Sequence, residues 1–198
     1  MKLADSFKVK SSEPAGHYAR ALRVIGQDLA DLFPQQVEID YQGNRFEVRV
    51  RCDRKRAEKR MPQAEKTGLR NIIHKLATYR LDKGPEGTEI ATVEQTYETE
   101  EINRLDEAGL HRRMQAGKVP DINSLGETLR TIGRMIDADD GRLIRIFKDQ
   151  RRVAFDYADK SGAMRKVEMT RSELFKLQQT YYDNRGSRQS IDSWRDHD

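Results

Sequence analysis

The chain has 198 residues, 36% hydrophobic and 35% charged, which suffices for one compact domain or two small ones with a lean apolar core. Its single cysteine excludes an intrachain disulfide framework and a cysteine-based metal cluster. It has no apolar run near the ~20 residues of a membrane helix, and its first segment, MKLADSFKVKSSEPAG, lacks the apolar core of a secretory signal. We therefore expect a cytoplasmic protein with no membrane partner.

The net charge of +4 is unevenly distributed along the chain. Residues 42–80 hold twelve Lys/Arg against four Asp/Glu, whereas residues 81–110 hold nine acids against two bases. The first stretch predicts a basic surface. The second is either a solvated acidic connector or a segment that folds over the basic stretch and competes with an anionic ligand.

The first predicted helix carries apolar residues at helical spacing, and the SSEP ahead of it offers start signals. These apolar residues are Tyr18, Leu22, Ile25, Leu29 and Leu32. A matching pattern later in the chain predicts a second helix, with Ser124 to Glu127 (SLGE) as its capping box. Its apolar residues are Ile122, Leu125, Leu129, Ile132 and Ile136.

Each of these helices precedes a predicted hairpin. In VEIDYQGNRFEVRV, a two-residue Gly43-Asn44 turn puts every apolar residue on one face. The predicted pairs are Tyr41 with Phe46, Ile39 with Val48 and Val37 with Val50, and on the outer face Glu38 with Arg49 and, diagonally, Arg45 with Asp40. The second copy, LIRIFKDQRRVAFDY, lacks the turn glycine, so its loop is expected to be longer or shifted.

The remaining elements differ between the halves. In the first, we predict a helix over 69–79, a strand over 88–97 and a polar, partly exposed helix over 99–117. In the second, ADKSGAMRKVEM predicts a turn and a third strand. Thr170 to Glu173 (TRSE) then caps a last helix that bears Leu174, Leu177, Gln178 and Tyr181.

A shift of 107 positions aligns residues 22–50 with 129–157 without a gap and gives six identities. They include Gly26 with Gly133, both mid-helix, where glycine costs ~1 kcal/mol relative to alanine unless another backbone approaches closely. The alignment predicts an internal repeat.

We therefore expect an α+β fold of two pseudo-repeated halves, each a small antiparallel sheet packed by amphipathic helices. The expected division is a first half over 1–80 with a basic segment at 45–60, an acidic connector over 81–116, a second half over 117–183 and a polar, flexible tail over 184–198.

Motifs for catalysis, cofactors and metals give no prediction here. The four histidines have no partner at metal-ligand spacing, and the fixed signatures of phosphate loops, dinucleotide folds and zinc proteases are missing from the sequence. DADDG, at 137–141, lacks the spacing of a calcium loop and is better explained as a helix end and turn, and DYADKSG, at 156–162, as a turn. A nuclease site built on Asp40, Glu47 and Arg49 competes with plain cross-strand ion pairing. The sequence therefore leaves enzymatic activity uncertain and leans against it.

The strongest functional signal is the basic run RVRCDRKRAEKR, in which arginine outnumbers lysine. Cations spaced in this way are typical of contacts to several phosphates. The candidate nucleic-acid-binding residues are Arg45, Arg49, Arg51, Arg54, Lys55, Arg56, Lys59 and Arg60. We predict a non-catalytic regulatory or accessory protein that grips the phosphate backbone of DNA or RNA. The alternative is a protein–protein interaction or adaptor module, possibly homodimeric, with no nucleic-acid ligand.

Overall fold

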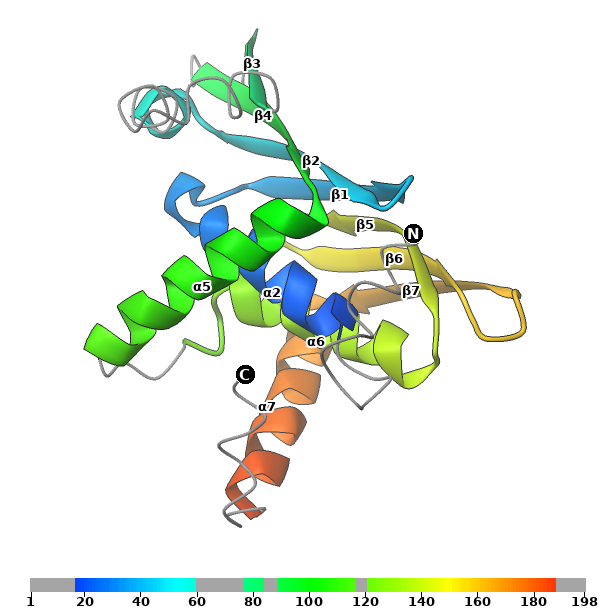
Figure 1. Cartoon of the computed structure of the whole chain (residues 1–198). Helices are drawn as coiled ribbons and strands as arrows, with labels where there is room; N and C mark the ends of the chain where they lie inside the picture. Colours follow the sequence, from blue (N-terminus) through cyan, green and yellow to red (C-terminus); the bar gives the residue numbers. More distant parts are fainter. Residues whose placement is uncertain (1–16, 60–76, 84–88, 117–120, 188–198) are drawn as a thin grey trace.

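A computed structural model describes residues 17–59, 77–83, 89–116 and 121–187, which fold into an α+β structure. Its strands form one antiparallel sheet in the order β3-β4-β2-β1-β5-β6-β7. The strands are β1 (Gln36–Gln42), β2 (Arg45–Asp53), β3 (Ala77–Lys83), β4 (Glu89–Tyr97), β5 (Arg142–Lys148), β6 (Arg152–Ala158) and β7 (Met164–Thr170). The helices are α2 (His17–Asp28), the 3₁₀ turn η1 (Ala30–Leu32), α5 (Thr99–Ala116), α6 (Leu125–Ala138) and α7 (Arg171–Ser187). The described helices α2, α5, α6 and α7 gather on one side of the sheet, and none of them covers its other face, which we call the open face (Figure 1).

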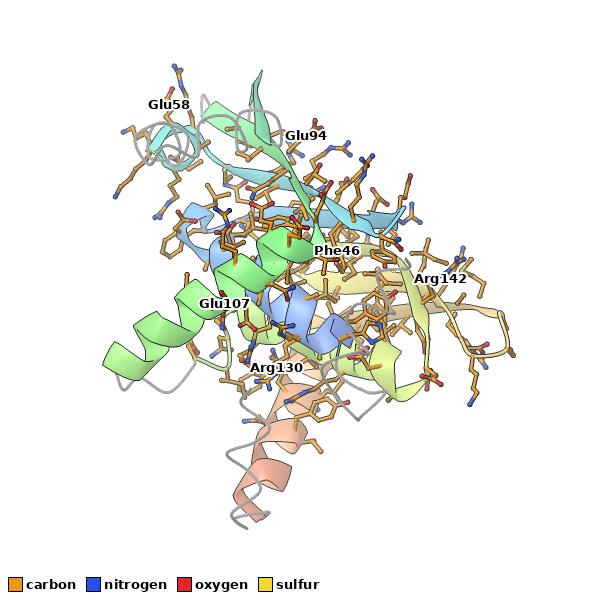
Figure 2. The ribbon with its side chains drawn as sticks, in the orientation of Figure 1. Phe46, Glu58, Glu94, Glu107, Arg130 and Arg142 are labelled. Carbon is orange, nitrogen blue, oxygen red and sulfur yellow. The ribbon has the colours of Figure 1, made fainter. Side chains whose placement is uncertain are left out.

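The first hairpin has the predicted register. Tyr41 lies opposite Phe46, and the Val37/Val50 and Ile39/Val48 pairs follow. Gly43 and Asn44 have φ angles of 54° and 69°, the left-handed values that a two-residue hairpin turn of type I′ requires. The apolar side chains of this hairpin therefore lie on the helix side, as Phe46 does in Figure 2, and all but the half-buried Tyr41 are buried in the core.

The sequence predicts a separate small sheet in each half, and this is wrong, because β1 pairs with β5 and joins the strands into one sheet. The centre of that pairing is Ile39 opposite Ile146, two residues that are 107 positions apart. The pairs on either side are Glu38 with Phe147 and Asp40 with Arg145. The joined sheet presents a single apolar face to α2 and α6, so the two halves share one core.

Helices α2 and α6 pack against each other through their backbones. A Cβ atom placed on Gly26 would lie 2.8 Å from the Cα of Gly126, and one placed on Gly133 would lie 2.5 Å from the Cα of Ala19. Real Cβ atoms do not approach backbone this closely, so a side chain at either glycine would push the helices apart. The expected close approach at the two mid-helix glycines is confirmed.

The C-terminal end of α6 also holds the first described turn of α2. The buried carboxylate of Asp137 accepts hydrogen bonds from the backbone N–H groups of Tyr18, at 3.1 Å, and Ala19, at 2.9 Å. Such an acceptor satisfies amides that have no partner within their own helix and favours the positive end of the helix dipole. The prediction that DADDG ends a helix is confirmed, since α6 stops at Ala138.

The acidic stretch is part of the folded unit where the structure describes it. Its strand and helix predictions are confirmed by β4 and α5. Strand β4 lies between β3 and β2, and α5 packs on α2 through buried Ile102. Asp106 of α5 also forms ion pairs with Arg20, at 2.8 Å, and Arg23, at 3.1 Å, on α2.

Several local predictions in the second half are confirmed. Ser124 accepts the N–H of Glu127 and so caps α6 as predicted, but its own N–H donates to the carbonyl of Asp121, so the second half of the predicted box does not form. Thr170 and Glu173 form a reciprocal capping box. The second hairpin loop is longer than the first by strand bounds, with three residues, 149–151, between β5 and β6. Strand β7 is the predicted third strand.

Two predictions of element type or extent are wrong. Tyr79, which the spacing places on a helix, lies in strand β3, because this segment pairs along β4. Helix α7 continues to Ser187, so residues 184–187 are helical and not part of a flexible tail. Residues 69–76 of the predicted helix and 188–198 of the tail lie outside the described residues.

The glycine contact gives a stability prediction. Replacing Gly133 by Ala should destabilise the fold by roughly 1–3 kcal/mol, because the added methyl group meets the α2 backbone and overpacking outweighs the gain in helix propensity. Urea denaturation measures this change. Gly109→Ala in α5 is the matched control, because the nearest atom to its Cβ would be 3.9 Å away; it should be neutral or stabilising by up to ~1 kcal/mol. Equal effects of the two substitutions would contradict the close contact.

Candidate nucleic-acid interface

The structure divides the eight predicted binding residues into two groups. Arg45, Arg49 and Arg51 lie on β2 with their side chains on the open face of the sheet. The next four lie on the segment 54–59, which is helical and follows β2 directly; we call it the basic segment. Its residues are Arg54, Lys55, Arg56 and Lys59. Arg60 lies outside the described residues.

The exposed β2 arginines are neutralised by neighbouring acids. Arg49 forms ion pairs with Glu38 on β1, at 3.1 Å, and Glu94 on β4, at 2.9 Å. Hydrogen bonds from Arg49 to these carboxylates, first to Glu94, raise the pKa of the guanidinium above its ordinary value. The predicted pairing of Glu38 with Arg49 is therefore confirmed, and one acid of the acidic stretch contributes to it.

Arg45 and Arg51 are also poorly placed for phosphates. Arg45 pairs at 2.8 Å with Glu47, two residues along the same strand and on the same face, so the predicted diagonal pair with Asp40 is wrong. Arg51 is half-buried, and its Nε atom is buried without a hydrogen-bond partner. Neither side chain presents a freely accessible, uncompensated charge.

The same compensation extends across the sheet. On the other side of β1, Arg145 pairs with Asp156 at 2.9 Å and Arg152 pairs with Glu168 at 2.8 Å. These pairs join β5 to β6 and β6 to β7. Most exposed arginines of the described sheet are therefore ion-paired, so the open face is not a continuous cationic surface.

The basic segment is different, because most of its charge is uncompensated. It is anchored by Ala57, which is fully buried, and its first turn is capped by Asp53, whose side chain accepts the N–H of Lys55. Arg54 pairs with Glu58 at 2.6 Å. Lys55, Arg56 and Lys59 are exposed, and in the described ranges none of these three takes part in an ion pair with an acid. Figure 2 labels Glu58 on this segment, at the end of the molecule far from α7.

An aromatic side chain that the sequence analysis missed lies beside these cations. The Phe33 ring lies under the guanidinium of Arg56, with 3.8 Å between the guanidinium carbon and the ring centroid. Phe33 is 65% exposed, although Leu32 directly before it is fully buried. The signal in the sequence is its position just after the apolar spacing of the first helix ends, immediately before Pro34.

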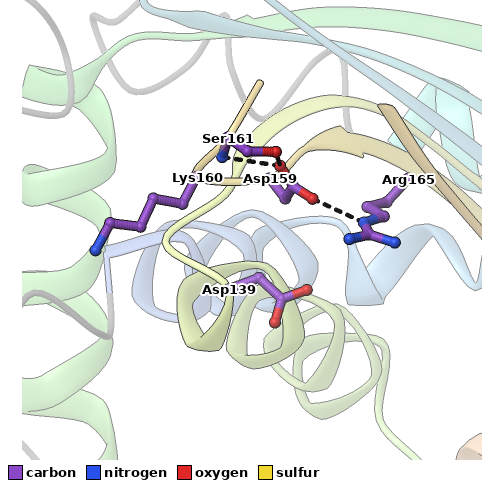
Figure 3. A pocket seen from close by; sticks show the side chains of 5 residues that line it. All are labelled: Asp139, Asp159, Lys160, Ser161 and Arg165. Carbon is purple, nitrogen blue, oxygen red and sulfur yellow. Dashed lines mark hydrogen bonds and ion pairs between the residues drawn. The ribbon is translucent and has the colours of Figure 1, made fainter. Parts of the chain in front are cut away.

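A shallow hollow next to the turn between β6 and β7 is a second place to look for chemistry (Figure 3). Asp159 lines it, but its carboxylate already accepts hydrogen bonds from the N–H groups of Ser161 and Ala163, from the Ser161 hydroxyl and from Arg165. Contacts to Ser161 and Arg165 lower the pKa of Asp159 to about 2. The turn prediction for DYADKSG is confirmed, and this carboxylate organises the turn.

The described histidine, cysteine and acidic residues do not come together in a metal or catalytic site. Within 17–59, 77–83, 89–116 and 121–187, no group of three His, Cys, Asp or Glu residues is arranged to hold a metal ion. His17 lies 3.8 Å from the Asp137 carboxylate that caps α2, and Cys52 is buried in β2. Among the described helices, none is long and apolar enough to cross a membrane.

The turn carboxylate gives a pH prediction. Because the fold lowers the pKa of Asp159 from 3.8 to about 2, the stabilising effect of its ionised carboxylate is full above about pH 5 and is lost progressively as the pH falls from there toward 2. The difference in unfolding free energy between the wild type and Asp159→Asn should therefore shrink between pH 5 and pH 2.5. Urea denaturation of both proteins at several pH values checks this, and a difference that stays constant with pH would contradict it.

The class of ligand is inferred from the geometry of the described residues. Comparisons of the chain with protein-family models, with curated proteins and with solved structures gave no match. The residues with the clearest functional chemistry are the exposed cations of the basic segment together with Phe33. They form the candidate interface.

Proposed function

We propose that the chain is a non-catalytic nucleic-acid-binding protein, with a regulatory or accessory role, and that its basic segment contacts the phosphate backbone. The observation that carries this proposal is the contrast between the two groups of cations. Lys55, Arg56 and Lys59 are exposed without an acidic partner in the described part of the chain, whereas the exposed arginines of β2, Arg45 and Arg49, are paired.

Phosphate binding follows from this contrast because an unpaired surface cation loses little when it binds. It releases condensed counterions from the nucleic acid and breaks no existing ion pair. Lys55 and Lys59 are four residues apart on one helical segment, where side chains at this spacing are neighbours, with Cβ atoms about 6 Å apart. They therefore offer two adjacent positive charges to one strand.

We further propose that the two halves arose from one repeated unit. In support, the 107-residue shift that relates their sequences also carries Ala19 and Gly26 onto Gly126 and Gly133, the residues of the helix contact. The same shift relates Ile39 to Ile146, which pair at the centre of the sheet. An insertion that contains the basic segment and β3 separates β2 from β4 in the first half, whereas β6 leads directly into β7 in the second.

The alternative function, a protein–protein interaction module, is favoured by the open face of the sheet. Positive and negative side chains alternate on this solvent-exposed face. Such a pattern complements a protein surface with the opposite arrangement of charges better than it complements a polyanion. Such a module would bind its partner through the open face and without the basic segment. The partner could be a second copy of the same chain, which would make the protein a homodimer. The charge-reversal experiment below separates the two functions.

The proposed function predicts the effect of reversing the free cations. Lys55→Glu/Lys59→Glu should weaken binding to DNA or RNA by at least about tenfold in 100 mM salt, because two phosphate contacts become repulsive. Fluorescence anisotropy with labelled single- and double-stranded oligonucleotides measures the affinity.

The matched control is Lys166→Glu/Lys176→Glu, which makes the same change in net charge at exposed positions on β7 and α7. It should retain most of the binding, and both variants should keep the wild-type urea midpoint. Equal loss in the two variants would indicate a net-charge effect. No binding by the wild type even at low salt would overturn the proposed function.

A further inference from the structure

We propose that Phe33 and Arg56 form a stacking platform for an unpaired base, so that the ligand of the basic segment is single-stranded nucleic acid. This inference rests on the proposed function and specifies its substrate class. The carrying observation is the position of an exposed aromatic ring, capped on one face by a guanidinium, directly beside the uncompensated cations.

Phe33 is exposed for a specific structural reason. It ends the η1 turn with φ 46° and ψ 60°, a left-handed conformation, and its N–H donates to the carbonyl of Ala30 at 3.1 Å. Residues other than glycine rarely adopt this conformation because their Cβ atom crowds the following carbonyl oxygen. The residue before it, Leu32, is fully buried, so the chain reverses between a core position and an outward-facing ring.

Glycine at this position would remove the backbone strain, and a polar residue would avoid exposing an apolar ring to water. In the described part of the chain, Phe33 and Met164 are the large hydrophobic residues that remain mostly exposed. Sites that keep a strained, exposed residue are candidates for function, provided that a specific chemistry is available there.

That chemistry is supplied by Arg56. Its guanidinium lies over the ring at 3.8 Å, and its Nη1 donates to the backbone carbonyl of Asp31 at 3.5 Å. These two contacts hold the basic segment against the η1 turn, next to each other in Figure 1 (cyan and blue). They also fix the orientation of the ring, and the 65% exposure leaves much of the ring surface open to solvent.

A ring held against the segment that carries Lys55 and Lys59 combines the two elements by which proteins bind single strands: an aromatic surface for a base and cations for the adjacent phosphates. In a duplex the bases are paired and stacked on each other, so their faces are not available to Phe33. Stacking therefore favours single strands, whereas phosphate contacts alone do not distinguish the two forms.

Substitution of Phe33 separates stacking from packing. Phe33→Leu keeps an apolar side chain but removes the aromatic face, whereas Phe33→Trp keeps and enlarges it. The probes are a labelled twelve-residue oligo(dT), the matching oligo(U), and a DNA duplex of the same length. For Phe33→Leu we expect a loss of about 10- to 100-fold in affinity for the single strands, with less than about twofold change for the duplex. Phe33→Trp should retain wild-type affinity or exceed it.

A second readout is independent of affinity. In a Trp194→Phe background, Phe33→Trp provides the only tryptophan, and a base stacked on it should quench its fluorescence when oligo(dT) or oligo(U) is added, but not when the duplex is added. Comparison of the DNA and RNA single strands shows which source of the base is preferred. Urea midpoints of all variants check that the fold is intact.

Failure of the inference and failure of the proposed function have different signatures. If the wild type binds and Phe33→Leu binds single strands as tightly, or loses duplex binding equally, the platform is overturned while the phosphate contact stands. Fluorescence of Phe33→Trp that is unchanged by bound single strands overturns it as well. If the wild type binds none of the probes at low salt, the proposed function itself fails.

Discussion

The backbone contact between α2 and α6 is the constraint on which the rest of the structure depends. Gly26 and Gly133 let two helices from distant parts of the chain meet without intervening side chains. At that separation both helices fit over the central strands, and the carboxylate of Asp137 reaches from the end of α6 to the first amides of α2. The strands beneath them join through β1 and β5 into one sheet with one apolar face. Small residues at both contact points are thus what allows a lean sequence to build one shared core.

The helices cover one face of the sheet, and the charged side chains of its strands therefore lie on the other face. Because no described helix covers the open face, its residues are solvated, and most of its exposed arginines find a carboxylate on the same or a neighbouring strand, as Arg45, Arg49, Arg145 and Arg152 do. Surface pairs of this kind contribute little stability, at most ~1 kcal/mol each, but they remove the positive potential that a polyanion would need. The basic segment leaves the sheet at the end of β2 and escapes this pairing. The basic run that is continuous in the sequence is therefore divided in the structure. Its β2 arginines belong to a largely ion-paired surface, and its basic segment forms a small cationic surface.

The sequence was most informative where the structure is local. The Gly43-Asn44 turn fixes the first hairpin, and the Thr170/Glu173 capping box fixes the start of α7, because each needs only neighbouring residues. The pairing of β1 with β5 was not predicted, since alternation shows which face of a strand is buried but not which strand lies beside it. Tyr79 was misplaced because a short apolar run fits either helix or strand spacing. Of the candidate site, the basic run was visible, but the carboxylates that neutralise Arg45 and Arg49 and the ring beneath Arg56 depend on tertiary contacts.

The central claim is that a few cations of the basic segment, and not the arginines of the sheet, bind phosphate. The most direct test is the salt dependence of wild-type binding to a single-stranded oligonucleotide. Three contacts, from Lys55, Arg56 and Lys59, predict a slope of about −2 for log affinity against log salt, since each contact to a single strand contributes about −0.7. A slope near −5 or steeper would mean that the paired arginines of the sheet also contact the strand, and salt-independent or undetectable binding would contradict the account altogether.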